Sequence, residues 1–563
     1  MAVIGIDLGT STSVVAWLNG MGKPAVLTNA EGDPSTPSVV FLEGPNNKVV
    51  GRVAKQNAIV YEGQIVECVK GAMGKDLNWT FFGESYTVEQ VAALILKKLA
   101  SDAELALKEP IEGVVITVPA CFGGAERNAT RNAASIAGLC VLGILDEPLA
   151  AAIAYGFGRQ DAKEARRTTL VYHLGGGTFD VTMMRLDGSE FSVLWTDGDR
   201  SLGGRNWDER IVKHISGELE KAHGEFPMDD SAVRQEIWLR AEILKKQLSI
   251  AESSPIVCRM GEDSVKVEIS REKFDELTAD LLERTKDITE GVVRKLRENE
   301  TLPGGWDDVD EIFLVGGSTR MRQVKSMLHE LTGKEPVAFD QDRVIAYGAA
   351  IYAVERLLQK PMEFWQKTNG SFEAPVPPSP IRGYEAEERI SPDAGLTNAA
   401  HKPASSCSFS LGIQMVDESG KPWNSILMGR GTLLPARQVR LFTTTHDGQR
   451  AIEGKLFEGE NADPAHCVAL GDFAITLPPG LPVGAPVDAT FEITNEADVR
   501  IAWKELTGGR SGEYIVSRGA PIEHRIDRGP RTITTGESLS GMGAGKQLFF
   551  HRVTRWLRKS GGG

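Results

Sequence analysis

The sequence predicts an α/β fold built from two similar lobes, followed by an all-β segment. Over residues 1 to 357, short Val/Ile-rich runs alternate with longer helical patterns, as where Gly113–Val118 precedes Gly124–Leu139. This alternation is typical of β-sheets covered by helices. A strand, a glycine turn and a second strand occur twice in this region, which indicates an internal duplication. From Cys407 to Ser517, short alternating runs separated by Gly, Pro and Asn predict strands alone.

Composition and charge restrict the class of protein. The chain has 563 residues, which predicts two or three domains. Its formal net charge of −14 argues against a nucleic-acid partner, because such a partner requires a cationic face. The sequence contains no apolar run long enough to cross a membrane as a helix, and its first residues lack a secretory pattern. We therefore expect a cytoplasmic protein with no transmembrane segment.

The six cysteines predict neither a zinc site nor a disulfide framework, because they show no CxxC spacing. Cys121 follows Pro119 and Ala120 at the end of an apolar run. A catalytic thiol is one interpretation of this position. We favour a buried structural cysteine, the more usual role of a free thiol.

Two segments differ from the rest in composition. Residues 358 to 406 contain seven prolines and little periodicity, which predicts a proline-rich linker. After Arg518 the chain has eight Lys and Arg against three Asp and Glu, so we expect residues 518 to 563 to form a basic flexible tail. Within it, Lys546–Lys559 has apolar residues at helical spacing. This pattern fits either a short amphipathic helix for an anionic membrane or acidic partner, or a solvated tail.

The two glycine turns predict a phosphate site that the lobes share. They are Gly9–Thr12 and Gly175–Thr178, each between two strand patterns. Glycine turns let backbone N–H groups point at a phosphate with no side chain in between. Asp7 and Asp180 lie beside the turns, where a carboxylate can hold the waters of a phosphate-bound Mg²⁺. The alternative is two ordinary hairpins in which the aspartates are turn formers.

Three further motifs support a nucleotide site. Leu314–Arg320 predicts a strand, a glycine turn and a helix, an arrangement suited to flat contact with an adenosine. Pro148, at an early helical position, puts Glu147 at the beginning of a helix. Within Ala241–Ser249, polar residues at i, i+3, i+4 and i+7 share one helical face. Taken alone, that charged face would be interpreted as solvated.

With these motifs in this order, the chain resembles the seventy-kilodalton heat-shock chaperones of the DnaK type, as a divergent, bacterial-looking member. The match extends from Val3 to about Leu357 and includes all five nucleotide-site motifs. The resemblance implies an actin-like (duplicated ribonuclease-H-like) ATPase domain at residues 1–357 and a β-sandwich peptide-binding domain at 407–517. It implies ATP/ADP and Mg²⁺ as cofactors, and unfolded polypeptide, a J-domain co-chaperone and a nucleotide exchange factor as partners. An actin-like sugar kinase shares the fold but lacks this combination of features.

The resemblance also assigns roles to single residues. Lys70 matches the lysine that activates the attacking water, and Asp7 and Asp180 match carboxylates around Mg²⁺, Asp7 acting through waters. The catalytic residues that it implies are Lys70, Glu147, His173, Thr178 and Asp180. The residues that match the phosphate loops and their neighbours are Gly9, Thr10, Ser11, Thr12, Gly175, Gly176, Gly177, Gly203 and Gly204. The residues that match the adenosine pocket are Glu242, Lys245, Lys246, Ser249, Gly316, Gly317, Ser318, Arg320 and Asp342.

His173 departs from the family, whose second phosphate loop begins with aspartate. An imidazole there removes one negative charge from the outer shell of the metal, and such losses typically cost about 10–100-fold in metal affinity or rate. A neutral imidazole can still accept a hydrogen bond from a metal-bound water or act as a base. We expect a weak ATPase that slowly hydrolyses ATP to ADP and phosphate. The alternative is a nucleotide-binding regulatory or interaction protein that has lost this activity.

The match in the all-β segment is looser. Carried across, it implies a cleft for an extended apolar peptide, lined by Ile413, Met415, Val416, Phe442, Thr445 and Ile452. Without the family, the same alternation would be interpreted as the core between two sheets. Too few residues follow Ser517 for the family's helical lid, so we expect a chaperone without one.

Elements that couple the two domains in the family are altered. Gly143 stands where the family has an arginine, and a leucine-rich linker is absent before the all-β segment. Pro119 and Arg127, which match the family's relay between the domains, are kept. We therefore expect the bound nucleotide to control peptide binding only weakly.

Overall fold

The computed structural model describes residues 2–156, 166–187, 190–223, 231–260, 263–359, 402–404, 406–416, 421–494 and 498–516. These residues belong to one compact unit, Met1–Ile522, whereas a second unit, Glu523–Gly563, lies outside them. The predicted tail at 518–563, with its helix at Lys546–Lys559, also lies outside the described residues, as does nearly all of the predicted linker at 358–406.

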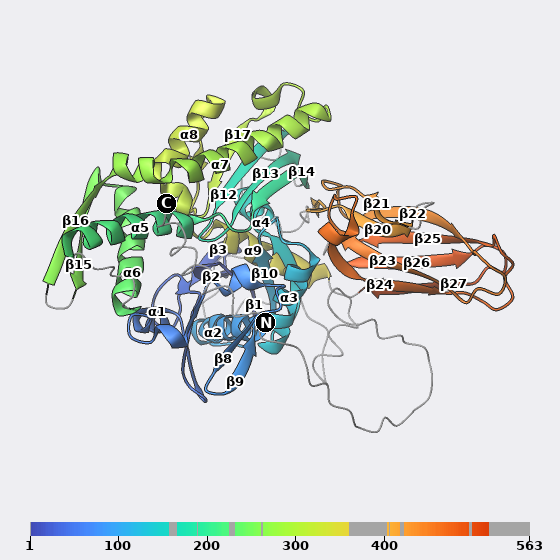
Figure 1. Ribbon diagram of the computed structural model, residues 1–563, viewed down its shortest axis with the longest axis horizontal. Helices are drawn as coiled ribbons and strands as arrows, with labels where there is room; N and C mark the ends of the chain where they lie inside the picture. Colours follow the sequence, from blue (N-terminus) through green and yellow to red (C-terminus); the bar gives the residue numbers. More distant parts are fainter. Residues whose placement is uncertain are drawn as a thin grey trace, which may run out of the picture. The chain divides into compact units, whose positions relative to one another are not determined.

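Two mixed sheets with the same arrangement of strands form the α/β region (Figure 1). The first has the strand order β11 (Val141–Asp146), β10 (Ile111–Val118), β1 (Ala2–Asp7), β2 (Thr12–Leu18) and β3 (Pro24–Leu27), with β4 (Thr36–Pro37) paired to β2. The second has the order β18 (Val337–Ala338), β17 (Glu311–Val315), β12 (Arg167–Leu174), β13 (Phe179–Asp187), β14 (Glu190–Asp199) and β19 (Lys402–Ala404). In each sheet three parallel strands are followed by two antiparallel ones. The sheets thus repeat one pattern, as the duplicated hairpin predicted.

Helices and smaller strand pairs surround these sheets. The helices are α1 (Arg52–Asn57), α2 (Val88–Leu107), α3 (Gly124–Ile136), α4 (Glu147–Gly156), α5 (Gly204–His223), α6 (Ser231–Leu248), α7 (Arg271–Glu298), α8 (Arg322–Thr332) and α9 (Val344–Gln359). The smaller groups are β5 (Val39–Gly44) with β6 (Asn47–Val50) and β7 (Ile65–Glu67), β8 (Asn78–Phe81) with β9 (Glu84–Thr87), and β15 (Ser253–Met260) with β16 (Asp263–Ser270). Local chemistry fixes several helix beginnings: Thr87 and Gln90 form a capping box at α2, and the Ser270 side chain caps α7.

The helices α4 and α9 pack against each other between the two sheets (Figure 1). Their apolar core also includes Val115 of the first sheet and Phe313 of the second. Small residues allow this close approach, because a Cβ on Gly348 of α9 would overlap the backbone of Ala150 in α4. A Cβ on Gly5 of β1 would likewise overlap α9. This contact sets how closely the two sheets approach each other.

The strands after residue 406 form two antiparallel sheets on one apolar core. The first sheet has the order β21 (Pro422–Met428), β20 (Leu411–Val416), β23 (Ala451–Glu458) and β24 (Val468–Thr476). The second has the order β22 (Ala436–Thr443), β25 (Pro486–Ile493), β26 (Val499–Glu505) and β27 (Ser511–Val516). Buried and half-buried residues alternate along β25, as expected of a strand with one face in the core. Strands form most of the described part of this region, as predicted, and a short 3₁₀ helix, Pro464–His466, lies between β23 and β24.

Most predicted elements of the α/β region are present, with small shifts at their ends. The helix predicted at Gly124–Leu139 ends at Ile136, where Gly138 adopts a positive φ. All six cysteines are free thiols, and Cys121 is buried, as we predicted for a structural cysteine. No helix among the described residues is long and apolar enough to span a membrane.

The contact between α4 and α9 can be tested with two matched glycine substitutions. Gly348→Ala should lower the thermal unfolding midpoint, since overpacking at the Ala150 backbone costs about 1–3 kcal/mol. Gly217→Ala, also inside a helix but with open space around it, should raise the midpoint slightly through the gain of up to about 1 kcal/mol in helix propensity. Calorimetry of both variants checks the prediction, and equal stabilisation by both would contradict the packing described here.

Candidate nucleotide site

The two predicted phosphate turns lie against each other. A Cβ on Gly177 would lie 2.6 Å from Cγ2 of Thr10, and a Cβ on Gly176 would overlap the side chain of Ser11. Larger residues at these positions would push the turns apart. The glycines therefore allow the two turns to approach this closely.

The second turn is held by neighbours that the sequence also predicted. The Gly204 N–H and the Ser318 hydroxyl both donate to the carbonyl of Gly175, each at 2.9 Å. A Cβ on Gly203 would overlap the backbone of Gly177. Gly316, at a φ of 86°, lies so close to the second hairpin that a Cβ there would stand 2.9 Å from Cδ2 of His173. The predicted glycines around the second turn thus form one cluster.

Four charged or titratable side chains gather beside the turns. His173 and Asp180 are direct partners in the antiparallel register of β12 and β13. Glu147 is the first residue of α4, directly after β11, and a helix N-terminus favours a carboxylate there. Lys70, in the short 3₁₀ helix Val69–Ala72, donates to Oε1 of Glu147. All four are buried, with 4% or less of each residue exposed.

The free ligand atoms of this group face one another. Nδ1 of His173 lies 3.3 Å from Oε2 of Glu147 and 3.9 Å from Oδ2 of Asp180. Oδ1 of Asp180 accepts a hydrogen bond of 3.1 Å from the backbone N–H of Cys121. Within the described part of the chain, Nδ1 of His173 and Oδ2 of Asp180 have no hydrogen-bond partner. Cys121 therefore positions Asp180 through its backbone, a role that the sequence did not predict.

Burial and mutual repulsion shift the acid–base properties of the group. Burial, together with the charge of Glu147, raises the pKa of Asp180 to about 7. The same causes raise the pKa of Asp7 to about 7, although Lys70 and a hydrogen bond from the Thr117 hydroxyl oppose them. Burial lowers the pKa of His173, against the attraction of Glu147. Asp7 and Asp180 therefore hold their protons more strongly than free carboxyl groups do, and a cation bound beside them would lower both pKa values.

The donor set of this group fits a divalent cation. Glu147, His173 and Asp180 offer ligand atoms that all lie within 4.8 Å of one another. Carboxylate oxygens, directly or through water, are the ligands that Mg²⁺ prefers. Asp7 lies outside this trio. Thr178, another predicted catalytic residue, is buried at the end of the second turn, where its carbonyl accepts from the N–H of Gly175.

On the predicted adenosine side, Glu242 of α6 carries two ion pairs. Lys55 of α1 binds its carboxylate at 2.6 Å, and Lys246 binds it at 2.7 Å. Burial raises the pKa of Glu242, but the two lysines outweigh that effect and bring it to about 2. Lys55 thereby joins the α1 segment to α6. Sequence reasoning missed it, because no local pattern marks a partner so distant in the chain.

The other predicted adenosine residues lie at two places, the C-terminal end of α6 and the glycine turn of Leu314–Arg320. Lys245 is buried and binds Asp208 at 2.8 Å and the Gly204 carbonyl at 2.8 Å, so it supports the second turn from behind. Arg320 and Asp342 form an exposed ion pair of 2.7 Å beside the glycine turn of Leu314–Arg320. The Ser249 hydroxyl donates to the Lys245 carbonyl, just beyond the end of α6. A Cβ on Gly317 would lie 2.9 Å from Oδ1 of Asp342.

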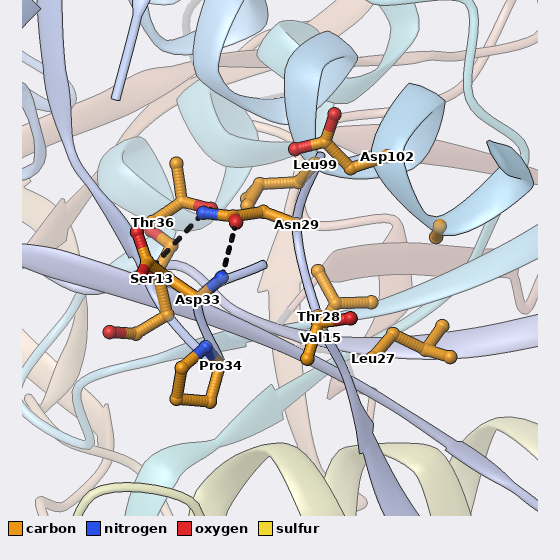
Figure 2. Close-up of a pocket in the computed structure, with 12 residues that line it drawn as sticks. Ser13, Val15, Leu27, Thr28, Asn29, Asp33, Pro34, Thr36, Leu99 and Asp102 are labelled. Carbon is orange, nitrogen blue, oxygen red and sulfur yellow. Dashed lines mark hydrogen bonds between the residues drawn. The ribbon is translucent and has the colours of Figure 1, made fainter. Parts of the chain in front are cut away.

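A separate small pocket lies along β2, between Ser13 and the end of α2 (Figure 2). None of the predicted nucleotide residues lines it. Asn29 fills its polar part, accepting from the N–H of Asp33 at 2.8 Å and donating to the Thr36 hydroxyl at 3.2 Å (Figure 2). Because these polar groups bind one another, the pocket is part of the packing behind the first turn.

The six predicted peptide-binding residues do not share one environment. Ile413 is only 3% exposed and belongs to the core of the all-β region, and Phe442 and Ile452 pack against that core. Met415 and Val416, at the end of β20, are 39% and 59% exposed. Thr445 is also exposed. The interpretation of Ile413 as core thus agrees with its burial, whereas Met415 and Val416 offer apolar surface.

Comparison with known proteins agrees with these features. The family described as Hsp70 protein matches residues 3–355. The chaperone protein DnaK of Thermosipho melanesiensis is 33% identical over 92% of this chain and 80% of its own length. The DnaK proteins of Thermosipho africanus and Thermotoga petrophila are each also 33% identical to this chain, over 92% of it and 80% of their own length. The chain belongs to the Hsp70 family. The resemblance predicted from the motifs is confirmed.

One altered position of this Hsp70 has a neighbour of the expected type. Gly143 lies on β11, where the sequence analysis expected an arginine. Nε of Arg356 on α9 lies 3.8 Å from the place that a Cβ of Gly143 would take, and it donates to the Leu142 carbonyl. A guanidinium group therefore does lie beside this strand, supplied by another element. Pro119 and Arg127 hold the segment after β10, where Arg127 donates to the Phe122 carbonyl.

The raised pKa of Asp180 predicts a pH-dependent stability of this Hsp70 without metal or nucleotide. The unfolded chain ionises this carboxyl near pH 4 and the folded chain near pH 7. Its contribution to stability is therefore complete below about pH 4 and is lost as the pH rises to about 7. One pKa unit corresponds to about 1.4 kcal/mol, so the loss reaches several kcal/mol. Asp180→Asn should gain stability relative to the wild type over this range.

Thermal unfolding of both proteins in metal-free buffer across this pH range measures the difference. Asp187→Asn, at the exposed end of the same strand, is the control and should follow the wild type. A difference between Asp180→Asn and the wild type that does not change with pH would contradict the raised pKa.

Proposed function

We propose that this protein is an ATP-dependent chaperone of DnaK type, in which residues 1–357 form an actin-like ATPase domain and residues 407–517 a β-sandwich that binds peptide. The main observation behind this proposal is that two glycine turns, from two sheets with the same strand arrangement, lie against each other beside the buried Lys70–Glu147 pair. The family match and the DnaK relatives over 92% of the chain support the same assignment. The proposed location is the cytoplasm.

The proposed nucleotide site assigns ATP phosphates to the backbone N–H groups of Gly9–Thr12 and Gly175–Thr178. Asp7, Glu147 and Asp180 would hold Mg²⁺ directly or through waters, and the ion would neutralise charge on the phosphates. Lys70 and Glu147, already paired, would orient the attacking water and hold its proton. The residues proposed around adenosine remain those of the sequence analysis, with Lys55 added through its bond to Glu242.

His173 is the reason to propose slow turnover. Phosphoryl transfer depends mainly on positioning and on charge stabilisation around the phosphates. The imidazole brings no negative charge to the metal, and its Nδ1 faces Glu147 at 3.3 Å, the carboxylate proposed to hold the water. Lys70, Glu147 and Asp180, which we also propose as catalytic, lie in the same buried group. We therefore favour a slow ATPase over a nucleotide-binding protein without activity.

We propose that the β-sandwich binds extended apolar segments of unfolded proteins at the exposed end of β20. Met415 and Val416 provide apolar surface, and Trp423, the register partner of Met415, is 42% exposed beside them. Such a surface recognises the main chain by strand-like hydrogen bonds and side chains by apolar contact. A J-domain co-chaperone and a nucleotide exchange factor are the further partners that family membership implies.

The decisive test of this function is steady-state ATP hydrolysis with Mg²⁺, with and without an apolar peptide. A chaperone should show slow hydrolysis that the peptide alters, together with binding of the peptide itself. Nucleotide binding without hydrolysis would favour the regulatory alternative. Failure to bind ATP would contradict the proposal.

Substitution of the histidine tests the cause of slow turnover. His173→Asp should raise single-turnover hydrolysis with Mg²⁺ by about tenfold or more, because it restores a carboxylate beside the metal. His446→Asp, on an exposed loop after β22, is the matched control and should leave the rate unchanged. A rate that stays constant or falls in His173→Asp would show that the limiting step lies elsewhere.

Two substitutions on β20 separate peptide contact from core packing. Met415→Ala should weaken binding of a labelled apolar peptide several-fold in fluorescence anisotropy and leave the unfolding midpoint unchanged, because the side chain is exposed. Ile413→Ala should instead lower stability by about 2–5 kcal/mol, since it empties a core position. Equal effects of both substitutions on affinity and stability would contradict this division.

We expect the affinity of the wild type for the labelled peptide to differ less than about fivefold between ADP and ATP.

A further inference from the structure

The group of Glu147, His173 and Asp180 has a property that the proposed Mg²⁺ site does not require. Each carboxylate has one oxygen held by a donor: Lys70 binds Oε1 of Glu147, and the Cys121 N–H binds Oδ1 of Asp180. The second oxygen of each carboxylate, Oε2 and Oδ2, faces Nδ1 of His173. Donors behind the ligands in this way fix the orientation of metal-binding side chains.

The imidazole nitrogen has no partner of its own. Nδ1 of His173 lies 3.3 Å from Glu147, yet the geometry is not that of a hydrogen bond, and no other described group binds it. Oδ2 of Asp180 is likewise buried and without a hydrogen bond among the described residues. Buried polar atoms are almost always satisfied in folded proteins. Two such atoms that face each other indicate a ligand between them.

The spacing of the three atoms suits a small cation. Metal–nitrogen and metal–oxygen bonds of about 2.0–2.2 Å give separations between adjacent ligands of about 3.0–3.5 Å. The separations of Nδ1 from the two carboxylate oxygens, 3.3 Å and 3.9 Å, need only small side-chain shifts to reach this range. The backbone positions are rigid, since His173 and Asp180 are opposite each other in a hairpin and Glu147 begins a helix.

The donor types decide which cation fits best. Mg²⁺ takes oxygen ligands, keeps several waters and demands near-ideal octahedral geometry. Imidazole instead suits first-row transition metals such as Co²⁺, Ni²⁺ and Zn²⁺, whereas Mn²⁺ shares the preference of Mg²⁺ for oxygen ligands. We propose that Glu147, His173 and Asp180 bind a divalent transition-metal ion directly, with Nδ1 of His173 as a ligand, in preference to Mg²⁺. The inference rests on the proposed nucleotide site for its biological use, but the three side chains form the metal site without nucleotide.

The test measures metal binding to the full chain freed of nucleotide. Calorimetric titrations with Zn²⁺ and with Mg²⁺ should give an affinity for Zn²⁺ at least about tenfold higher in the wild type. In His173→Asp this ratio should fall by about tenfold or more, because a carboxylate oxygen replaces the nitrogen ligand. His214→Asp, a half-buried histidine on α5 outside the site, is the matched control and should keep the wild-type ratio.

A spectrum identifies the ligand independently of affinity. Co²⁺ added to the wild type should give visible absorption bands that change in His173→Asp but not in His214→Asp. Unfolding midpoints of all three proteins show whether the variants are folded, and His173→Gln provides a second, uncharged replacement that should also lose the preference.

Two results would overturn the inference: equal affinity ratios in the wild type and His173→Asp, or no binding of Zn²⁺ without nucleotide. Binding of ADP with Mg²⁺ to the wild type, measured in parallel, separates this result from the proposed function. If ADP binds while the metal preference is absent, only the transition-metal site is wrong. If ADP does not bind either, the nucleotide site itself is wrong.

Discussion

The close packing of α4 on α9 is the contact on which the rest of the α/β region depends. Glycine and alanine at this contact let helix backbones approach within a distance that larger residues would prevent, as at Gly348 and Ala150. The two sheets on either side are thereby brought near enough for their glycine turns to touch. The helix α4 also begins with Glu147, so the same helix that joins the sheets carries a central carboxylate of the site.

Much of this arrangement could be predicted because the patterns that determine it are short and continuous in the sequence. Strand, glycine turn and strand are contiguous in the sequence, and the first residue of α4 follows from Pro148. The sequence could not predict that the side chains of His173, Glu147 and Asp180 face one another, because this depends on hairpin register and on helix packing. Lys55 was missed for a similar reason, because its partner Glu242 is distant in the chain.

The all-β region shows a different limit of prediction. Short alternating runs predicted strands in this region, but burial along β20 does not alternate: Leu411–Ile413 are buried, and Met415 and Val416 are exposed. The family match assigned both Ile413 and Met415 to one cleft, but they differ sharply in burial. The two residues are two positions apart and therefore lie on the same face of β20. Among the described pairs, β23 reaches only from Leu411 to Ile413, so the difference in burial depends on how far the neighbouring strand extends, which the sequence of β20 does not contain.

The duplication makes Asp7 and His173 equivalent positions, each at the end of a first hairpin strand and just before a glycine turn. Two like halves would surround the nucleotide with the same kind of oxygen ligand on both sides. At this pair of positions, the first half of this chain offers an oxygen and the second half a nitrogen. The two halves therefore differ chemically at equivalent positions. A cation placed between them has a preferred side, so the site is asymmetric although the fold around it is internally symmetric.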